Sequence, residues 1–287
     1  WSSDVCSSDL VITYNGVTTP PTNAGIYTII ATVTNANYTG SATNTLVVSP
    51  ATLTVSNLLA NSRVYNGTNT ATISAGGASL IGLYSGDTVT LVTNGYRATF
   101  ADKVVGTGIE VTITNLSLAG ASAGNYELDQ PVTATADITA KNLTVSGVVA
   151  ANKVYDGETT AEVYFTNAVL VGVVSGDDVT LDSSSAAGEF ATATVGVGKT
   201  VTVSGLALGG ADAGNYTVTQ PTTTANITKA VAVVTLTAED LGQSYDRTGH
   251  VVTAATDPEG LTTVVTYNGS ASAPTNAGSY KIGRAHV

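Results

Sequence analysis

Sulfur and imidazole are scarce in this sequence of 287 residues. It has no methionine, one cysteine (Cys6), one tryptophan (Trp1) and two histidines, of which only His250 lies away from the chain ends. A lone cysteine cannot form a disulfide within the chain, and a sequence almost free of thiols is compatible with an oxidising exterior. Most residues that carry catalysis or hold a metal are therefore missing, and we expect no cofactor.

Positive charge is also scarce, with 10 Lys and Arg against 21 Asp and Glu, a formal net charge of -11. Binding to a phosphate backbone needs clustered basic side chains, so a nucleic-acid partner is not expected. The acidity resists adhesion to anionic lipid, and no apolar run approaches the roughly 20 residues that span a bilayer. We therefore expect a soluble chain without membrane insertion.

Threonine is abundant instead, with 49 residues in a chain of which only 11% is charged. Threonine is β-branched, which favours strands, and it supplies the polar half of an alternating strand. In Tyr27–Val33, alternate residues are apolar, and no stretch keeps a helical period over three turns. Glycine, asparagine and proline interrupt these runs about every 8–12 residues, which is typical of a β-sandwich or barrel.

The two ends of the chain share one unusual feature. Residues 4–9 (DVCSSD) can be encoded by GACGTGTGCTCTTCCGAT, whose reverse complement translates as residues 282–287 (IGRAHV). The alternative, chance, requires complementarity over all 18 bases. We interpret residues 1–10 and 282–287 as derived from a sequencing adaptor and leave them out of the fold prediction. This interpretation makes the remainder an internal fragment of a larger protein.

A repeat with an offset of 90 residues occupies the centre. Without a gap, residues 51–131 and 141–221 share 36 identities in 81 positions. The identities are mainly apolar, glycine and turn residues, and the only ionisable one besides tyrosine is Asp87/Asp177, in a Ser-Gly-Asp stretch that suits a tight turn. We call residues 50–140 the first copy and residues 141–229 the second copy. A shared catalytic apparatus is hard to place in them.

A second repeat, with an offset of 253 residues, flanks the copies. Tyr-Asn-Gly at 14–16 and Pro-Thr-Asn-Ala-Gly-Ile-Tyr at 21–27 recur, with one change, at 267–269 and 274–280. Residues 11–49 (the leading flank) would supply the later strands of this module, and residues 230–281 (the trailing flank) its earlier ones. We expect neither flank to complete a core. At the junctions 137–145 and 226–234 we expect the last strand of one module to pass directly into the first strand of the next without a spacer, which predicts a stiff array.

The predicted fold is therefore all-β. We expect a tandem array of small, Ig-like β-sandwich modules of about seven strands each, forming an extended rod. For the flanks, β-grasp-like modules are the alternative.

These motifs carry a family resemblance. The copies resemble the YDG repeat family, through Val154-Tyr155-Asp156-Gly157 and the Gly-Asn-Tyr signature at 124–126 and 214–216. The flanks are similar to the MBG repeat family, through Tyr-Asn-Gly and Pro-Thr-Asn-Ala-Gly-x-Tyr. The resemblance implies tandem arrays in large secreted or surface-attached bacterial proteins, including filamentous-haemagglutinin-like adhesins, and no catalytic residues. The first copy departs from the motif with Asn66 in place of Asp156.

The recurring tyrosines and glycines have two interpretations. An aspartate beside an aromatic could bind a sugar, but Asn66 replaces Asp156, and a tight turn fits both copies whereas a charge fits one. A tyrosine can also bury its ring and hydrogen-bond its hydroxyl to a neighbouring loop. We therefore predict a structural motif, with the Gly-Asn-Tyr tyrosine opening a late strand like a tyrosine corner. Its residues are Tyr65, Gly67, Tyr126, Tyr155, Gly157 and Tyr216.

Other candidate sites are weak. Calcium wants several carboxylate and carbonyl oxygens, but there is no Asp-x-Asp-x-Asp-Gly loop, and Thr88 and Ser122 stand where the second copy has aspartates. Lys141 and Lys153 are available for an intramolecular cross-link. His250 is the only candidate for Ser-His-Asp catalysis, and no nucleophile elbow or phosphate-binding loop is present. The candidates for calcium are Asp177, Asp178, Asp182 and Asp212.

The expected function follows from these absences. We expect a non-enzymatic stalk or spacer of a large extracellular or cell-surface bacterial protein, whose partners are the neighbouring modules of its own chain. The alternative is direct binding of host or matrix glycans or proteins, for which an exposed aromatic patch repeated in both copies would be the sign. A third interpretation, an accessory region of a carbohydrate-active enzyme, would need a catalytic domain elsewhere.

Overall fold

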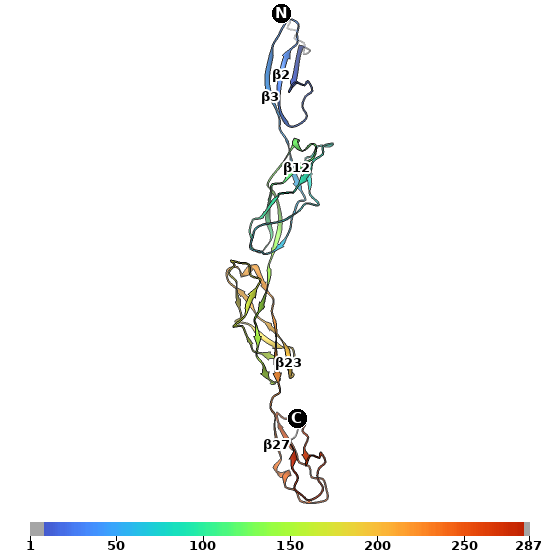
Figure 1. The fold of residues 1–287 in the computed structure, drawn as a ribbon, viewed down its shortest axis with the longest axis vertical. Helices are drawn as coiled ribbons and strands as arrows, with labels where there is room; N and C mark the ends of the chain where they lie inside the picture. Colours follow the sequence, from blue (N-terminus) through green and yellow to red (C-terminus); the bar gives the residue numbers. More distant parts are fainter. Residues whose placement is uncertain (1–8, 284–287) are drawn as a thin grey trace. The chain divides into compact units, whose positions relative to one another are not determined.

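The structure is a computed structural model that describes residues 9–283 (Figure 1). Most elements are strands, as the alternation predicts, and the all-β class is confirmed. No helix among residues 9–283 is long and apolar enough to cross a membrane. Within residues 10–283 the helical elements are three short 3-10 turns, η2 (Ala123–Asn125), η3 (Ala213–Asn215) and η4 (Ala238–Leu241).

The chain divides into two units. The first unit contains residues up to Val145 together with Val169–Asp182 and Leu206–Thr219, and the second contains Ser146–Ala168, Ser183–Gly205 and the chain from Gln220 onward. The second copy therefore contributes strands to both units. We describe each unit by itself. The module boundaries at 50, 141 and 230 remain predictions from the sequence.

The leading flank is a small antiparallel sheet in the first unit, of order β1-β2-β3. Its middle strand alternates as predicted, with Tyr27, Ile29, Ala31 and Val33 half-buried and the residues between them exposed. No residue between Asp9 and Pro50 is fully buried, so this sheet has no closed core. The strands are β1 (Leu10–Tyr14), β2 (Gly25–Val33) and β3 (Ser41–Val48).

The first copy follows in the same unit and contains eleven strands, more than the about seven expected, because turn residues divide the predicted strands into short pieces. Two sheets, of order β10-β11-β14-β6 and β13-β4-β8, are joined by the ribbons β12-β9 and β5-β7. The pairs β13–β4 and β14–β6 are parallel. The bounds are β4 (Ala51–Ser56), β5 (Leu59–Ala60), β6 (Arg63–Val64), β7 (Ile73–Ser74), β8 (Ser79–Ile81), β9 (Thr90–Val92), β10 (Arg97–Phe100), β11 (Gly106–Thr114), β12 (Ser117–Ala119), β13 (Tyr126–Leu128) and β14 (Val132–Thr139).

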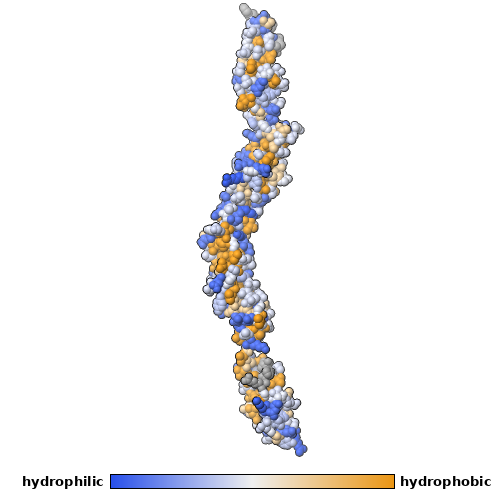
Figure 2. Space-filling view, in the orientation of Figure 1, coloured by the Kyte–Doolittle hydropathy of each residue, from blue (hydrophilic) through white to orange (hydrophobic). Residues whose placement is uncertain are grey.

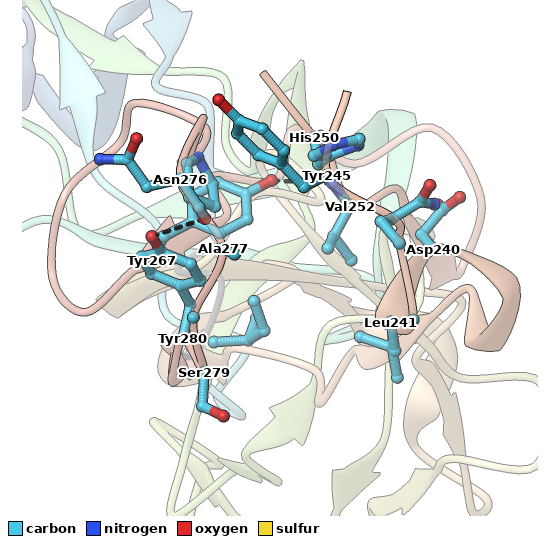
Figure 3. Close-up of a pocket in the computed structure, with 15 residues that line it drawn as sticks. Asp240, Leu241, Tyr245, His250, Val252, Tyr267, Asn276, Ala277, Ser279 and Tyr280 are labelled. Carbon is cyan, nitrogen blue, oxygen red and sulfur yellow. Dashed lines mark hydrogen bonds between the residues drawn. The ribbon is translucent and has the colours of Figure 1, made fainter. Parts of the chain in front are cut away.

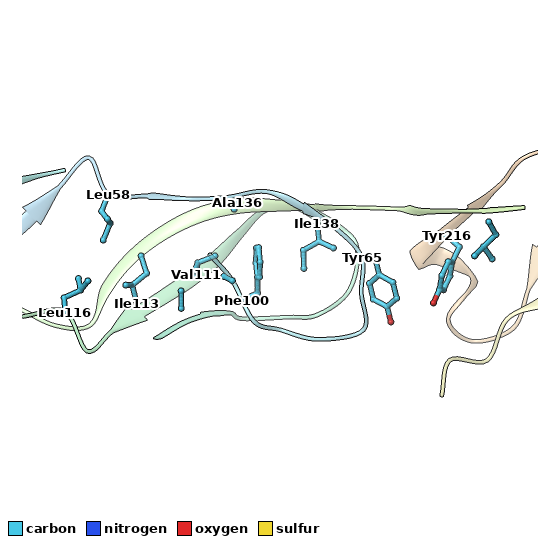
Figure 4. Close-up of a cluster of buried hydrophobic side chains, with 12 residues drawn as sticks. Leu58, Tyr65, Phe100, Val111, Ile113, Leu116, Ala136, Ile138 and Tyr216 are labelled. Carbon is cyan, nitrogen blue, oxygen red and sulfur yellow. The ribbon is translucent and has the colours of Figure 1, made fainter. Parts of the chain in front are cut away.

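The core of the first copy lies between these strands. Phe100, Val111, Ile113 and Ile138 are almost completely buried, and each has an apolar counterpart in the second copy. Burial of such side chains stabilises a fold by roughly 1.5–3 kcal/mol each. Figure 4 shows the cluster as a row of side chains that runs from Leu116 through Phe100 to Tyr65 and on to Tyr216.

The first unit also includes strands of the second copy. The sheet β20-β15-β25 and the ribbon β21-β24 reproduce the order β8-β4-β13 and β9-β12 of the first copy. This equivalence is what 36 shared residues predict. The bounds are β15 (Lys141–Ser146), β20 (Val169–Val171), β21 (Thr180–Asp182), β24 (Ala207–Gly209) and β25 (Tyr216–Val218).

The second unit holds the rest of the second copy, as the sheet β17-β26-β23-β22-β18 and the ribbon β16-β19. Its core includes Phe190, Val201 and Ile227, which take the places that aromatic and branched side chains hold in the first copy. The bounds are β16 (Val149–Ala150), β17 (Lys153–Val154), β18 (Thr160–Ala161), β19 (Val163–Tyr164), β22 (Ala187–Phe190), β23 (Gly196–Ser204) and β26 (Thr222–Thr228).

The trailing flank, also in the second unit, forms two separate two-stranded ribbons, β27-β28 and β29-β30. Val252 and Tyr267 are its buried side chains. The ribbons are too small to enclose a larger core. The bounds are β27 (Val233–Leu236), β28 (Ala254–Asp257), β29 (Thr266–Tyr267) and β30 (Ile282–Gly283).

The two segments that we expected to be short junctions differ. One residue, Ala140, separates β14 from β15, whereas four residues, 229–232, separate β26 from β27. The prediction of direct strand-to-strand passage is therefore correct for the first junction and wrong for the second, because residues 229–232 form no strand.

Only the inner ends of the two segments assigned to an adaptor lie within the described residues. Residues 1–8 and 284–287 lie outside the described residues. Leu10 pairs with Val33, and Ile282 pairs with Tyr267, so both inner ends of the assigned segments take part in strands.

Candidate functional site

The motif Val-Tyr-Asn/Asp-Gly forms the same turn in both copies. In the first copy it follows β6, where Tyr65 N donates to Thr139 O at 2.8 Å. Asn66 Oδ1 accepts the Thr68 N–H at 3.0 Å, and Gly67 has a φ of +77°. A side-chain oxygen that caps the N–H two residues later is the usual reason for Asn or Asp in a turn.

The second copy repeats this geometry after β17. Tyr155 N donates to Thr228 O at 2.8 Å, Asp156 Oδ1 accepts the Glu158 N–H at 2.9 Å, and Gly157 has a φ of +84°. Asparagine and aspartate therefore have the same role in the two turns, and a negative charge is not required for it.

A basic side chain lies beneath each turn. Lys153 Nζ donates to Asp156 at 2.8 Å and to the Glu158 and Thr160 carbonyls at 2.8 and 3.0 Å, and it lies 5.6 Å from the centre of the Phe190 ring. The hydrogen bond from Lys153 is the largest cause that lowers the pKa of Asp156. The cation thus joins the turn to the core through a charged bond and a cation–π contact.

Arg63 takes the same position in the first copy. Its guanidinium donates to Asn66 and to the Thr68 carbonyl and lies 5.1 Å from the centre of the Phe100 ring. Burial lowers the pKa of Arg63. Sequence reasoning missed this pair because Arg and Lys do not count as an identity, although both lie two residues before the motif tyrosine.

Tyr65 extends from its turn into a contact with the second copy, inside the first unit (Figure 4). Its side chain is 1% exposed, and its hydroxyl donates to Asp177 Oδ2 at 2.9 Å. Its ring lies edge-on to the Tyr216 ring, with 5.4 Å between centroids. Burial, and then the bond to Asp177, raise the pKa of Tyr65 to about 12.

Asp177 is the centre of this contact. It accepts the hydroxyl of Tyr216 as well as that of Tyr65, and the Tyr216 oxygen in turn accepts the Val174 N–H at 3.0 Å. One carboxylate therefore holds a tyrosine from each copy. The sequence interpretation of this residue as a turn former does not include this role.

The asparagine of Gly-Asn-Tyr makes a second contact. Asn215 is 6% exposed, and its Oδ1 accepts the Val105 N–H from the first copy at 3.0 Å. Its counterpart Asn125 accepts the Ala24 N–H of the leading flank at 2.9 Å. In both places the signature asparagine accepts a backbone N–H from the module that comes before it in the chain.

The comparison with family models confirms the predicted tandem arrangement of repeats. Residues 49–135 and 139–225 match the model of the YDG domain, which thereby covers more than half of the chain. The chain belongs to the YDG domain family. Residues 5–52 and 232–285 match the MBG domain, so two partial MBG domains flank the two YDG copies, and the chain is a repeat protein.

Other comparisons add little. No curated protein matches the chain. Among solved structures, domains 4–9 of the surface layer protein SbsC are similar, with 14% identity over 92% of this chain and 47% of that one, and a TM-score of 0.17. This chain spans about half the length of that structure, and a likeness at this TM-score carries no argument.

The two YDG tyrosines differ in their surroundings. Tyr65 is buried, whereas Tyr155 is 45% exposed, and no residue in the described part of the chain bonds its hydroxyl. The difference has a physical cause, because the partners of Tyr65 belong to the next YDG copy and the sequence after Tyr155's copy continues with an MBG segment. Tyr126, like Tyr216, is buried at the start of its strand, and its hydroxyl donates to Asp87.

Three of the calcium candidates, Asp177, Asp178 and Asp212, accept hydrogen bonds. Asp212 Oδ2 accepts the Asp178 N–H at 2.9 Å, and Asp178 Oδ2 accepts the Ala211 N–H at 3.2 Å. Asp177 holds the two tyrosines, and Asp182 lies in β21. Within residues 9–283 no three or more His, Cys, Asp or Glu side chains are grouped as metal ligands.

His250 lies beside a cavity of about 410 Å³ in the trailing MBG segment (Figure 3). Its Nε2 is 3.2 Å from Asp246 Oδ1 but makes no hydrogen bond there. Asp240, on the same wall, accepts the Thr253 N–H at 2.9 Å. Three tyrosines, Tyr245, Tyr267 and Tyr280, are among the residues that line the space, and its one acid, Asp240, is engaged in a local bond.

Proposed function

We propose that this chain is a spacer: a non-enzymatic stalk segment of a large secreted or cell-surface bacterial protein, such as an adhesin. The observation that carries the proposal is the contact of Tyr65 with Asp177 and Tyr216. Asp177 is the one shared ionisable residue other than tyrosine, and it is used to join one module to the next. Because these side chains join one module to the next, each added module extends the chain.

The contacts of the signature asparagines support the same role. Asn125 joins an MBG segment to a YDG copy, and Asn215 joins two YDG copies. The same residue thus serves at junctions of two kinds. A YDG copy can therefore follow a module of either family and use the same acceptor at the junction.

The alternative, direct binding of glycans or proteins, has less support. Its sign would be an aromatic patch exposed in both copies. Of the four candidate tyrosines, Tyr65, Tyr126 and Tyr216 are buried and only Tyr155 is exposed. On the face shown in Figure 2, hydrophobic residues lie in small patches separated by hydrophilic ones. We also propose that the chain lies at the cell surface and has no enzymatic activity.

The test is a length series measured by small-angle X-ray scattering. Chains with two, three and four YDG copies between the same flanks are compared. A spacer predicts that the maximum dimension grows by the same increment with each added copy. A maximum dimension that grows only as the cube root of mass would contradict the proposal. Specific binding of the parent chain to a glycan array would instead favour the adhesive alternative.

A further inference from the structure

We propose that the exposed turn end of the second YDG copy is a docking surface for another YDG copy. We define this tyrosine end by Tyr155, Gly157 and Val195. The partner is the end of a YDG copy that carries the equivalents of Asp177, Asn215 and Tyr216, which we call the receptor end. This inference does not rest on the spacer role, because it concerns which module fits this surface.

The first copy shows what the surface binds. Its tyrosine end has the same residues at the same offsets, and it is covered by the receptor end of the second copy. Tyr65 is 1% exposed there, whereas Tyr155 is 45% exposed. The two ends have the same turn geometry, so the difference lies in the presence of a partner and not in the fold of the turn.

The glycines of the two turns give an independent measure of the same difference. A Cβ atom added at Gly67 would lie 2.8 Å from Val174 Cγ1 of the second copy, which is closer than side chains approach. A Cβ atom added at Gly157 would meet no atom within 4 Å. The surface over Gly67 is therefore closely packed, and the surface over Gly157 is open.

One apolar side chain of the second tyrosine end is also more exposed than its counterpart. Val195 is 44% exposed, whereas Val105 is half-buried in the first copy. Val105, the counterpart of Val195, packs on the hydrophobic cluster that includes Tyr216 and donates its N–H to Asn215. An uncovered apolar surface next to a phenol hydroxyl suits a partner that offers both apolar contacts and a hydrogen-bond acceptor.

The chemistry of the contact selects the partner. The receptor must offer a carboxylate for the phenol, an aromatic ring for edge-on packing and an amide oxygen for the Val195 N–H. Asp177, Tyr216 and Asn215 provide all three in the YDG family. The trailing MBG segment contains neither Ser-Gly-Asp nor Gly-Asn-Tyr, so a YDG copy is the module that fits.

The experiment compares the full chain with an extended chain, in which a second copy of residues 141–229 follows Lys229 and carries Tyr155→Phe, so that the chain contains a single Tyr155. Tetranitromethane nitrates exposed tyrosines, and peptide mass spectrometry reports the rate at Tyr155. We expect Tyr155 to react in the parent chain and roughly tenfold more slowly in the extended chain, as expected for a hydroxyl bonded to a carboxylate. Tyr65 is the internal reference and should be protected in both chains.

A matched variant assigns the effect. The extended chain with Asp177→Ala in the added copy alone should restore nitration of Tyr155, while a far-UV circular dichroism spectrum equal to that of the extended chain would show that the added copy is folded. Equal nitration of Tyr155 in the parent and extended chains would overturn the proposal. Protection that survives Asp177→Ala would also overturn it, because the assigned acceptor would not be responsible.

Discussion

At the scale of single residues, the contact between the YDG copies depends on one carboxylate. The sequence marks Asp87 and Asp177 as shared, and it marks the tyrosines as structural. It could not predict that Tyr65 and Asp177 meet, because they are 112 positions apart and no local pattern encodes such a distance. It also gives Tyr65 and Tyr155 the same expected burial, since burial here depends on the neighbouring module.

Replacing this carboxylate should destabilise the chain. Asp177→Ala leaves two tyrosine hydroxyls without their acceptor, and we expect a loss of about 2–3 kcal/mol, since hydrogen bonds to charged groups contribute about 1.5–3 kcal/mol. Asp87→Ala is the matched control, because Asp87 accepts the hydroxyl of Tyr126, which belongs to the same copy. The measurement is the midpoint of urea unfolding of both variants. An equal effect of the two substitutions would contradict the role of Asp177 between copies.

The stability of the chain should depend on pH in the range in which the buried hydroxyl of Tyr65 loses its proton. Folding raises the pKa of this phenol from 10 to about 12. A group with a raised pKa in the folded state stabilises fully below its unfolded pKa, and this contribution is lost as pH rises through the folded one. We therefore expect the stability advantage of the parent chain over Tyr65→Phe to shrink from about pH 10 to 12. A constant difference in urea midpoint across this range would contradict the assignment.

At the scale of elements, the period-two alternation predicted strands such as β2 with the correct inward face. What it could not predict is the pairing. The parallel pairs join Ala51 to Tyr126 and Arg63 to Ile138, and their register depends on contacts between the two ends of a copy. The roles of Arg63 and Lys153 were missed because Arg and Lys do not count as an identity between the copies, and because several of their partners are backbone carbonyls and an aromatic ring.

Two substitutions distinguish the contribution of Lys153 from that of the turn residue Asp156. Lys153→Met removes the hydrogen bonds to Asp156, Glu158 and Thr160 and the contact with Phe190. We expect the folded state to lose roughly 1–2 kcal/mol of stability. Asp156→Asn keeps the side-chain oxygen that caps the turn, as Asn66 does in the first copy. Its melting temperature should therefore stay closer to that of the parent. A larger loss of stability from Asp156→Asn than from Lys153→Met would show that the charge of Asp156, and not the set of contacts made by Lys153, maintains the turn.

At the scale of the whole molecule, repetition was the most informative feature of the sequence. The 90-residue offset identified the two copies, and the 253-residue offset identified the flanks, from the order of the residues alone. The difference between the two junctions was not visible, because both read as strand passing into strand. The structure separates them by local pairing, since Lys141 begins β15 and pairs with Tyr216, whereas Lys229 is exposed and outside any strand.

This difference predicts the order of cleavage by trypsin, which cuts after lysine where the backbone can leave its structure. Lys229 should be cut early and Lys141 late in the parent chain, because a paired strand must open before it is cleaved. The double variant Asp177→Ala, Asn215→Ala should speed cleavage at Lys141 and leave the rate at Lys229 unchanged. Timed digestion with mass spectrometry gives both rates from one sample. If Lys141 is cut as fast as Lys229 in the parent chain, the contact between the YDG copies does not hold the junction closed.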